Sequence, residues 1–385
     1  MSIMKIVIAP DSYKESLTAL EVATEIEAGF REVFPNAEYL KIPMADGGEG
    51  TVAAMVDATG GTLIEVSVTG PIGEPVAASY CLSGDGTTAI IEMASASGLA
   101  LVAPHLRNPW KTTSYGTGEL IRAALDKGVT HLIIGIGGSA TNDGGAGMLQ
   151  ALGVKLLDSS GREIGFGGGR LANLDKIDVC DMDPRLKECR IEAACDVNNP
   201  LTGPKGASAV FGPQKGAAPE MVAGLDANLI RYAIIITRDL GKQVDQVPGA
   251  GAAGGMGAAL LAFLGAQLRS GIEIVMEAVG LEAAVKDADL VITGEGRIDS
   301  QTINGKTPIG VARMAKRYGK PVIGIAGSLA SDAALVQGHG IDAVFSILSQ
   351  VSTVDEALAN AAVNVRTASR NIAATLKLAK EIHHF

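Results

Sequence analysis

Residues 5–26 read KIVIAPDSYKESLTALEVATEI, and this stretch decides the fold. The run from Lys5 to Ala9 is apolar and rich in β-branched residues, and Pro10 closes it, which is typical of a buried parallel strand. Thr18 and Glu21 follow as a capping-box pattern, which marks the start of a helix. The stretch therefore predicts the first strand and the first helix of an α/β domain.

The same alternation continues in both end segments of the chain. A second strand is expected over 39–44, and a helix that ends near Gly60 follows it. The C-terminal segment adds three strands that alternate with helices, followed by a long helix, at 289–293, 321–326, 343–348 and 354–380. Five strands with crossing helices match a flavodoxin-like, doubly wound parallel sheet. We therefore expect one domain that is built from the two chain ends.

The middle of the chain has a different pattern. Three strand-like segments lie close together and predict an antiparallel meander, at 62–68, 75–82 and 87–93. We expect a mixed α/β domain over 66–285, inserted into a flavodoxin-like domain of residues 1–65 and 286–385, with the active site in the cleft between them. Residues 113–150 fit either domain, since the apolar run 131–136 suits a parallel sheet equally well.

Composition limits the function classes. The net charge of −10 has the wrong sign for neutralising a nucleic acid backbone, so no nucleic acid partner is expected. The four cysteines show no metal-binding spacing, and we interpret them as reduced thiols of a cytoplasmic protein. The longest apolar stretch, 254–266, is too short to span a bilayer, so no membrane segment is expected. The oligomeric state stays open, with a homodimer among the candidates.

Two strand ends that are far apart in sequence carry polar side chains. Asp11 and Lys14 follow the first strand, whereas Glu295, Arg297 and Asp299 follow the strand over 289–293. In a flavodoxin-like strand order these two strands are neighbours at the switch point, where ligands bind at the carboxyl ends. The sequence therefore predicts that these residues share a ligand site.

Glycine-rich loops supply further candidate sites. Asp46 opens the loop 46–51 between a strand and a helix, where free N–H groups favour an anion, although a plain tight turn fits the same residues. Gly254 and Gly255 lie in the loop 249–257, which could cradle a phosphate or simply allow close helix packing.

A third glycine loop supports a rival function. Residues Gly135–Ala140 match the dinucleotide pattern G-x-G-x-x-A, and Asp158 lies where such a fold places its ribose-binding acid, so an NAD-dependent hydroxy-acid dehydrogenase is one alternative. Asp143, however, falls in the opening turn, where its charge opposes a pyrophosphate unless a cation lies between them. Ser139, Asn142 and Asp143 suit a magnesium-bound phosphate or a polyhydroxy substrate better. A purely structural loop is a further alternative.

The segment after the strand over 191–195 carries a reactive combination. Asp196 stands at the strand end, and a proline- and glycine-fixed segment with Lys205 and Lys215 follows it. A carboxylate in this place could act against phosphate oxygens, although a turn-capping aspartate is the plain alternative. No histidine spacing indicates zinc, and no G-x-S-x-G elbow is present. What remains is carboxylates, lysines and glycine loops, which are the groups that phosphoryl transfer requires.

Six separated motifs together resemble the type I bacterial glycerate kinases, in the glycerate 2-kinase branch. They run in order along nearly the whole chain: APDSYKESL (9–17), ADGGEGT (45–51), GGSATNDGG (137–145), CDVNNPLTG (195–203), GPQKG (212–216) and TGEG through DSQT (293–302). The resemblance implies an ATP-dependent kinase that uses Mg²⁺ and phosphorylates the alcohol group of D-glycerate in glyoxylate and sugar-acid breakdown. It implies ADP and 2-phosphoglycerate, rather than 3-phosphoglycerate, as products. A non-catalytic hydroxy-acid-binding protein is the remaining alternative.

The motifs also suggest roles, which we state as hypotheses. Asp196 and Lys14 are the candidate catalytic residues, and Asp196 and Glu295 are the candidate magnesium ligands, with Asp196 acting as the base or as a ligand. The residues expected to bind glycerate are Asp11, Asp46, Arg297, Asp299 and Gln301. The residues expected to bind the nucleotide and its phosphates are Gly137, Gly138, Ser139, Asn142, Asp143, Lys215, Gly254 and Gly255.

Overall fold

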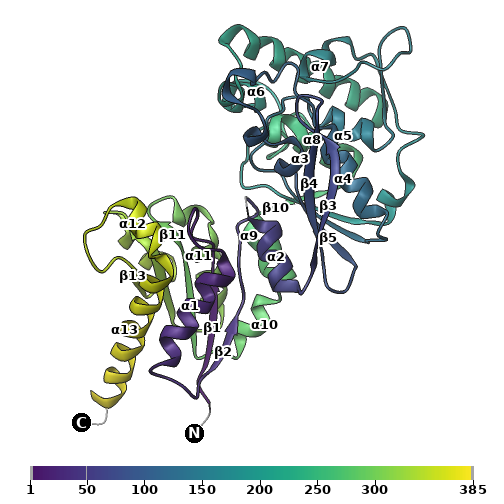
Figure 1. Cartoon of the computed structure of the whole chain (residues 1–385). Coiled ribbons are helices and arrows are strands. Elements are labelled where there is room, and N and C mark those ends of the chain that lie inside the picture. The colour runs from purple at the N-terminus through teal and green to yellow at the C-terminus, as the bar shows by residue number, and fades with distance from the viewer. Residues whose placement is uncertain (1–2, 49, 383–385) are drawn as a thin grey trace. The chain divides into compact units, whose positions relative to one another are not determined.

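The computed structural model describes residues 3–48 and 50–382, so Glu49 of the 46–51 loop lies outside the described residues. The chain forms two compact units, drawn in Figure 1. Unit 1 combines residues 1–46, 57–59 and 272–385, and unit 2 combines residues 47–56 and 60–271. The expected domain boundaries, and an active site between the domains, stay predictions.

Unit 1 is built on a five-stranded sheet in which all neighbouring strands are parallel. Its strands are β1 (Lys5–Pro10), β2 (Glu38–Lys41), β11 (Leu290–Ile298), β12 (Val322–Leu329) and β13 (Ala343–Ser346). The order β13–β12–β11–β1–β2 is the flavodoxin-like arrangement, and it puts β1 beside β11 at the switch point. The expected fold class is therefore confirmed for this unit.

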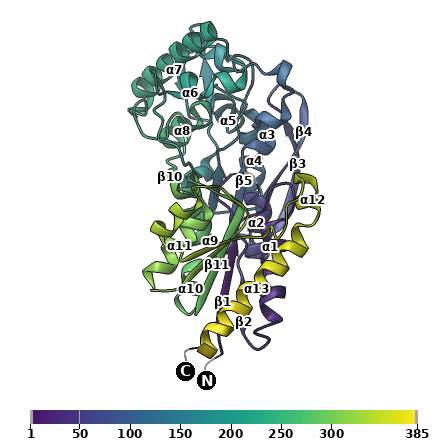
Figure 2. The same cartoon turned by 90° about the vertical axis from the view of Figure 1, so that its left-hand side faces the viewer.

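Helices cover both faces of the unit 1 sheet. They are α1 (Ala19–Arg31), α9 (Gly271–Ala278), α10 (Leu281–Lys286), α11 (Thr307–Arg317), α12 (Val354–Ala359) and α13 (Ala361–Ile382), with the 3-10 helices η6 (Thr302–Asn304) and η7 (Ala333–His339). Figure 2 shows α1 and α13 on one side of the sheet and α10 and α11 on the other. The expected capping box is confirmed, because Thr18 and Glu21 each accept a hydrogen bond from the other's backbone N–H.

Two expected elements of unit 1 differ from the structure. The sequence places the end of a strand at residue 293, but β11 continues past it because its second half pairs with β12. Glu295 and Arg297 are therefore strand residues rather than loop residues. The single helix expected over 354–380 is broken at Asn360, which ends α12 before α13 begins.

Unit 2 contains a six-stranded mixed sheet in the order β10–β9–β6–β5–β4–β3. Its strands are β3 (Thr62–Thr69), β4 (Pro75–Leu82), β5 (Thr88–Glu92), β6 (His131–Gly135), β9 (Arg190–Ala194) and β10 (Gln267–Arg269). The antiparallel meander is confirmed, since β4 pairs antiparallel with both β3 and β5. The apolar run at 131–136 forms β6, which lies parallel to β5 and β9 inside this sheet. A separate antiparallel pair joins β7 (Lys155–Leu157) and β8 (Lys176–Asp178).

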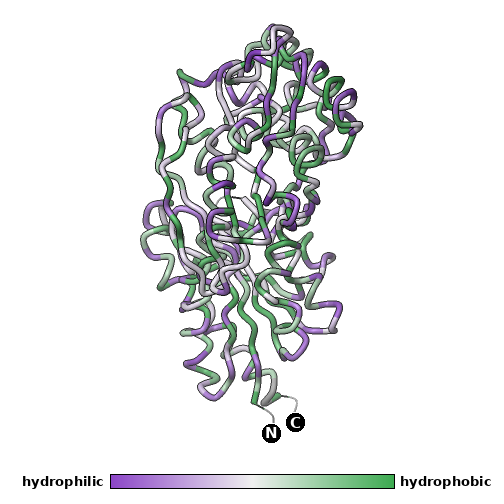
Figure 3. Tube along the Cα trace, turned by 90° about the vertical axis from the view of Figure 1, so that its right-hand side faces the viewer, coloured by the Kyte–Doolittle hydropathy of each residue, from purple (hydrophilic) through white to green (hydrophobic). Residues whose placement is uncertain are grey.

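The core of unit 2 lies between this sheet and its helices. The helices are α3 (Ala94–Ser97), α4 (Tyr115–Leu125), α5 (Ala146–Ala151), α6 (Ala207–Phe211), α7 (Pro219–Leu240) and α8 (Ala252–Phe263). Helix α2 (Thr51–Thr59) begins in unit 2 and ends in unit 1, to which residues 57–59 belong. The 3-10 helices are η1 (Leu99–Leu101), η2 (Pro104–Leu106), η3 (Gly168–Asn173), η4 (Pro184–Glu188) and η5 (Pro213–Lys215). Strand residues such as Ile91 and Ile134 are fully buried. Figure 3 shows that hydrophobic and hydrophilic stretches alternate along the chain. Within the described part of the chain, no helix is long and apolar enough to cross a membrane.

Candidate active site

The carboxyl end of β1 carries Asp11, at the switch point of unit 1. Its backbone N–H donates to the Gly294 carbonyl of β11 at 2.8 Å, which fixes the end of β1 against the neighbouring strand. Asp11 Oδ1 accepts hydrogen bonds from the backbone N–H (2.6 Å) and the hydroxyl (3.3 Å) of Ser12. Asp11 Oδ2 accepts one from the hydroxyl of Thr307 at 2.7 Å. Groups from two separate parts of the chain therefore hold this carboxylate in one orientation.

Glu295 on β11 is the second fixed carboxylate, and its residue is only 9% exposed. Its Oε1 accepts a hydrogen bond from the Thr302 hydroxyl at 2.5 Å. Its Oε2 lies 3.4 Å from the Lys306 ammonium nitrogen. Thr302, Lys306 and Thr307 all belong to the short segment from η6 to the start of α11, so one segment holds both Asp11 and Glu295.

Both carboxyl groups have perturbed pKa values. Loss of hydration raises the pKa of Asp11 to about 6, because the hydrogen bond from Thr307 offsets only part of that loss and the charge of Asp46 adds to the increase. Loss of hydration also raises the pKa of Glu295, and the negative charge of Asp11 contributes to it. Asp11, Asp46 and Glu295 therefore form an electrostatically coupled cluster, which is the kind of arrangement that gathers at functional sites.

Lys14 lies on a turn shortly after Asp11 in the sequence, and its side chain is exposed. The preceding residue, Tyr13, is buried and anchors the turn, since its hydroxyl donates to the Ile325 carbonyl of β12 at 2.8 Å. The turn also packs on β11 at Gly296, where a Cβ atom would lie 3.6 Å from the Lys14 backbone nitrogen. These two contacts anchor the turn, and the Lys14 side chain extends from it into solvent.

The remaining residues expected to bind glycerate form a second group after Glu295. The Arg297 side chain is 67% exposed, and its Nε lies 3.6 Å from Asp299 Oδ2. The Gln301 backbone N–H donates to Asp299 Oδ1 at 2.8 Å, and the Asp299 N–H donates to the Thr302 hydroxyl oxygen at 3.1 Å. Thr302 therefore links this group to Glu295.

Sequence reasoning did not select Thr302 or Thr307 as site residues. The segment from Gly305 to Thr307 resembles the end of a phosphate loop, but Ser300 replaces the first glycine that such a loop requires, so the sequence favours Lys306 as a solvated lysine at a helix start over a phosphate contact. No local signal in the sequence pairs the Thr307 hydroxyl with Asp11, because these residues are 296 positions apart.

In unit 2, three expected site residues follow neighbouring parallel strands. Gly135 of β6 pairs with Ala194 of β9, so the loop after β6 and Asp196 leave the same edge of the sheet. Gly137 and Gly138 are exposed on this loop, and a Cβ atom at Gly137 would meet nothing within 4 Å. Asp196 is also exposed, and its Oδ1 accepts a hydrogen bond from the Gly271 N–H at 3.2 Å. This edge thus offers bare backbone and a carboxylate to a ligand.

Asp143 has a different setting, since it is fully buried beneath this loop. Its Oδ2 accepts hydrogen bonds from the Ser114 N–H (2.9 Å), the Ser114 hydroxyl (2.8 Å) and the Gly147 N–H (3.2 Å), and its Oδ1 accepts one from the Gly145 N–H (3.1 Å). Burial raises the pKa of Asp143, and these hydrogen bonds oppose the increase. The carboxylate satisfies the free N–H groups at the start of α5.

Lys215 lies inside unit 2 as well, with 1% of the residue exposed. Its ammonium group donates to the Ser139 hydroxyl at 2.6 Å and to the Thr141 carbonyl at 2.7 Å. Burial lowers the pKa of Lys215 to about 7, and the negative charge of Asp143 limits the decrease. Lys215 therefore holds the loop after β6 in place from the interior of unit 2.

Asn142, Gly254 and Gly255 complete this buried framework. The Asn142 side-chain amide donates to the Ser208 hydroxyl at 2.9 Å. Gly254 and Gly255 have positive φ angles (68° and 93°), and a Cβ atom at Gly254 would lie 2.0 Å from the Thr141 carbonyl oxygen. The second and third glycine loops thus pack directly on each other, and the phosphate-binding roles of these buried residues stay predictions.

Asp158, the residue on which the dehydrogenase alternative depends, is committed to a local turn. Its Oδ1 accepts hydrogen bonds from the backbone N–H groups of Ser160 (2.8 Å) and Arg162 (3.0 Å). Its Oδ2 accepts two more from the Arg162 guanidinium, at 3.1 and 3.2 Å. This carboxylate is a turn cap, which removes the support for a ribose-binding acid.

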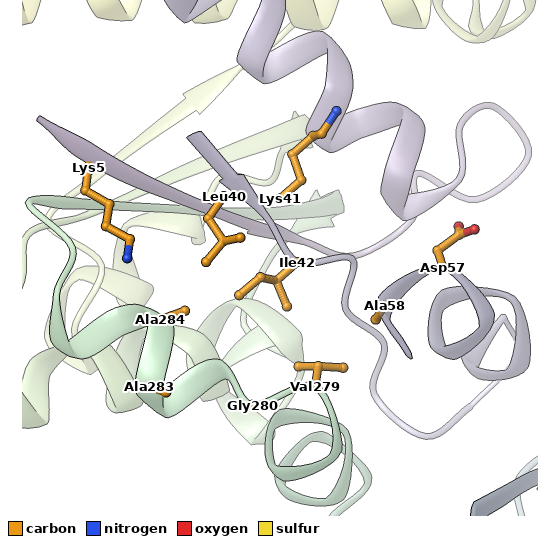
Figure 4. A pocket seen from close by; sticks show the side chains of 10 residues that line it. All are labelled: Lys5, Leu40, Lys41, Ile42, Asp57, Ala58, Val279, Gly280, Ala283 and Ala284. Carbon is orange, nitrogen blue, oxygen red and sulfur yellow. The ribbon is translucent and has the colours of Figure 1, made fainter. Parts of the chain in front are cut away.

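A pocket of about 450 Å³ lies in unit 1 and contains none of the expected site residues. Figure 4 shows Leu40, Ile42 and Val279 among its walls. The Lys41 ammonium points away from it, toward α1, where it pairs with Glu27 Oε2 at 3.0 Å. Lys5 and Asp57 also line the pocket, so it combines apolar and charged groups.

Comparison with known proteins agrees with the resemblance. The model of the family described as "Glycerate kinase family" matches residues 6–377. The Glycerate 2-kinase of Escherichia coli (strain K12) is 64% identical over 375 residues, which cover 97% of this chain and 98% of that protein. The Glycerate kinase of Bacillus subtilis (strain 168) is 61% identical over 377 residues, covering 98% and 99%. A crystal structure titled "putative glycerate kinase 2 from Salmonella typhimurium LT2" has a TM-score of 0.92 and 64% identity to this chain, and the match covers 99% of this chain and 100% of that one.

Proposed function

The chain belongs to the glycerate kinase family, and from that premise we propose that it transfers the γ-phosphoryl group of ATP to D-glycerate. The observation that carries this proposal is 64% identity, over nearly the full length of both chains, to a protein named Glycerate 2-kinase. The same name supports 2-phosphoglycerate as the product, together with ADP. The enzyme is thus an ATP-dependent kinase with an alcohol group as the acceptor.

Glycerate is a small acid with two hydroxyl groups, and unit 1 supplies matching groups. The exposed side chains of Lys14 and Arg297 can pair with its carboxylate. Asp11, Asp46, Asp299 and Gln301 can bind its hydroxyls, since carboxylate and amide oxygens accept hydrogen bonds from alcohols. The placement of the cluster at the carboxyl ends of β1 and β11 supports this assignment, because ligands of flavodoxin-like sheets bind there.

ATP is assigned to unit 2. Gly137 and Gly138 expose backbone at the carboxyl edge of β6, where phosphate oxygens can approach N–H groups without meeting side chains. Ser139, Asn142, Asp143, Lys215, Gly254 and Gly255 would then act mainly by fixing the shape of that loop. We propose Asp196 and Lys14 as the catalytic residues, with Lys14 binding substrate and Asp196 acting at the phosphates.

Magnesium is the metal that an ATP-dependent kinase implies. Among the residues that the structure describes, no group of three or more His, Cys, Asp or Glu side chains could hold a metal ion alone. Magnesium keeps several waters and is bound by one or two carboxylates plus substrate phosphates. Asp196 has an exposed carboxylate of this kind, and Glu295 is the second candidate ligand. When bound, the ion would neutralise charge on the phosphoryl oxygens.

The cellular setting follows from the same features. All four cysteines are free thiols, which supports a reducing cytoplasm. Glycerate phosphorylation belongs to the breakdown of glyoxylate and sugar acids, and glycerate and ATP are the only partners that the proposal needs. A homodimer stays a prediction.

One coupled assay tests the function against both alternatives. Purified protein is incubated with magnesium, ATP and a panel of small hydroxy acids, and ADP formation is followed. The kinase produces ADP with D-glycerate, whereas a dehydrogenase reduces NAD and a binding protein consumes no nucleotide. ³¹P NMR of the product then separates 2-phosphoglycerate from 3-phosphoglycerate.

A further inference from the structure

We propose that Asp11 accepts the proton of the glycerate hydroxyl during phosphoryl transfer and that Thr307 is the positioning residue that orients it. This inference rests on the proposed function, because it assigns the base of that reaction. It differs from the initial hypothesis for the base, which named Asp196.

The hydrogen bonds of Asp11 leave one acceptor position in a defined direction. A carboxylate oxygen accepts about two hydrogen bonds. Oδ1 already accepts two from Ser12, at 2.6 and 3.3 Å. Oδ2 accepts one from Thr307, at 2.7 Å. Oδ2 therefore retains the capacity for one further donor, such as a single alcohol group.

The other carboxylate of the cluster is less suited to this task. Glu295 Oε1 accepts the Thr302 hydroxyl at 2.5 Å, and Oε2 faces the Lys306 ammonium at 3.4 Å. Each Glu295 oxygen thus already has a partner, and the Lys306 charge offsets only part of the rise in the Glu295 pKa that burial causes. A general base works best when its pKa is close to the working pH, and burial has raised the pKa of Asp11 toward neutral pH.

Thr307 is fully buried and is the first residue of α11. Its hydroxyl spans from the helix to the end of β1, so its contact with Asp11 joins two elements that meet at the switch point. Removing the hydroxyl would leave only the two hydrogen bonds from Ser12 to orient the carboxylate. A serine at this position can keep the hydrogen bond, whereas a valine of similar shape cannot.

The proposed step balances as follows. The glycerate hydroxyl oxygen forms a bond to the γ-phosphorus of ATP, and the bond from that phosphorus to the β–γ bridging oxygen breaks. ADP leaves with the bonding electron pair. The hydroxyl proton passes to Asp11 Oδ2, and the partly exposed carboxyl group then releases it to water.

The test compares four variants of the full-length enzyme with the wild type in the magnesium, ATP and D-glycerate assay. Asp11→Asn keeps the shape of the side chain but removes the base, and we expect kcat to fall by about 100-fold or more while the KM for ATP changes little. Thr307→Val should lower kcat by roughly 10-fold, and Thr307→Ser should restore it to within about 3-fold of wild type. Asp57→Asn is the matched control, because it removes an exposed carboxylate outside the cluster.

Two outcomes overturn the proposal. The first is an Asp11→Asn enzyme that is folded by circular dichroism and keeps kcat within about 3-fold of wild type. The second is equal loss of kcat in Thr307→Val and Thr307→Ser, which would indicate packing rather than a hydrogen bond. Should Asp11→Asn fail to fold, the comparison of the two Thr307 variants decides. A wild-type enzyme that forms no phosphoglycerate would instead refute the proposed function itself.

Discussion

Replacing Lys215 with methionine should remove a specific pH dependence from the stability of unit 2. Burial lowers the pKa of this lysine to about 7 in the folded protein, well below its usual value. Between pH 7 and 10 the unfolded chain therefore holds a proton that the folded chain has released. Unfolding takes up that proton, so the free energy of unfolding increases as the pH increases through this window.

The size of the effect follows from this difference in proton binding. One proton difference changes the free energy of unfolding by about 1.4 kcal/mol per pH unit. Between pH 7.5 and 9.5, the free energy of unfolding of the wild type should increase by about 2.5 kcal/mol more than that of Lys215→Met. Below pH 7 both states of the wild type bind the proton, so the difference between wild type and variant becomes constant.

The assay uses urea unfolding followed by the fluorescence of Trp110, the single tryptophan of the chain, which lies in unit 2. Wild type, Lys215→Met and the exposed-lysine control Lys205→Met are compared at pH 6.5, 7.5, 8.5 and 9.5. The control should follow the wild type at every pH. Parallel pH profiles for wild type and Lys215→Met would show that Lys215 is charged across the range and would refute the reasoning.

Two further predictions concern the loop after β6 and the carboxylate beside it. Gly254→Ala should destabilise the protein by more than about 2 kcal/mol in urea unfolding, because its Cβ atom would lie 2.0 Å from the Thr141 carbonyl oxygen at a φ of 68°. In Gly137→Ala the new Cβ atom meets no atom within 4 Å, so this variant should change the free energy of unfolding by less than about 0.5 kcal/mol and should instead raise the KM for ATP. Equal stability losses in the two variants would contradict this. Asp196→Asn should stay folded, since the side chain is exposed, but should need roughly 10-fold more magnesium for half-maximal activity, and an unchanged magnesium titration would exclude Asp196 as a ligand.

Local sequence patterns predicted most of the fold. The capping box at Thr18 and Glu21 fixed the start of α1, and the spacing of the segments between 62 and 93 predicted the meander. The assumed flavodoxin-like strand order placed Asp11 and Glu295 on neighbouring strands, and the pairing of β1 with β11 confirms it. These features depend on residues that are close in sequence or on general topological rules.

The interior of the site could not be predicted in the same way. The hydrogen bonds from Thr307 to Asp11 and from Lys215 to Ser139 join positions 296 and 76 apart, and nothing in the local sequence specifies them. The glycine pattern at 254–255 also has two physical causes, since both a phosphate and a neighbouring backbone exclude a Cβ atom. Only the structure shows that the Thr141 carbonyl is the group that Gly254 meets.

Product analysis with the wild-type enzyme tests the account most directly. Purified protein is supplied with magnesium, ATP and D-glycerate, and the reaction is followed by ³¹P NMR. The account predicts equal amounts of ADP and 2-phosphoglycerate, with no product when glycerate is omitted. Persistence of ATP alongside unmodified glycerate, in a protein that is folded and binds both compounds, would contradict it.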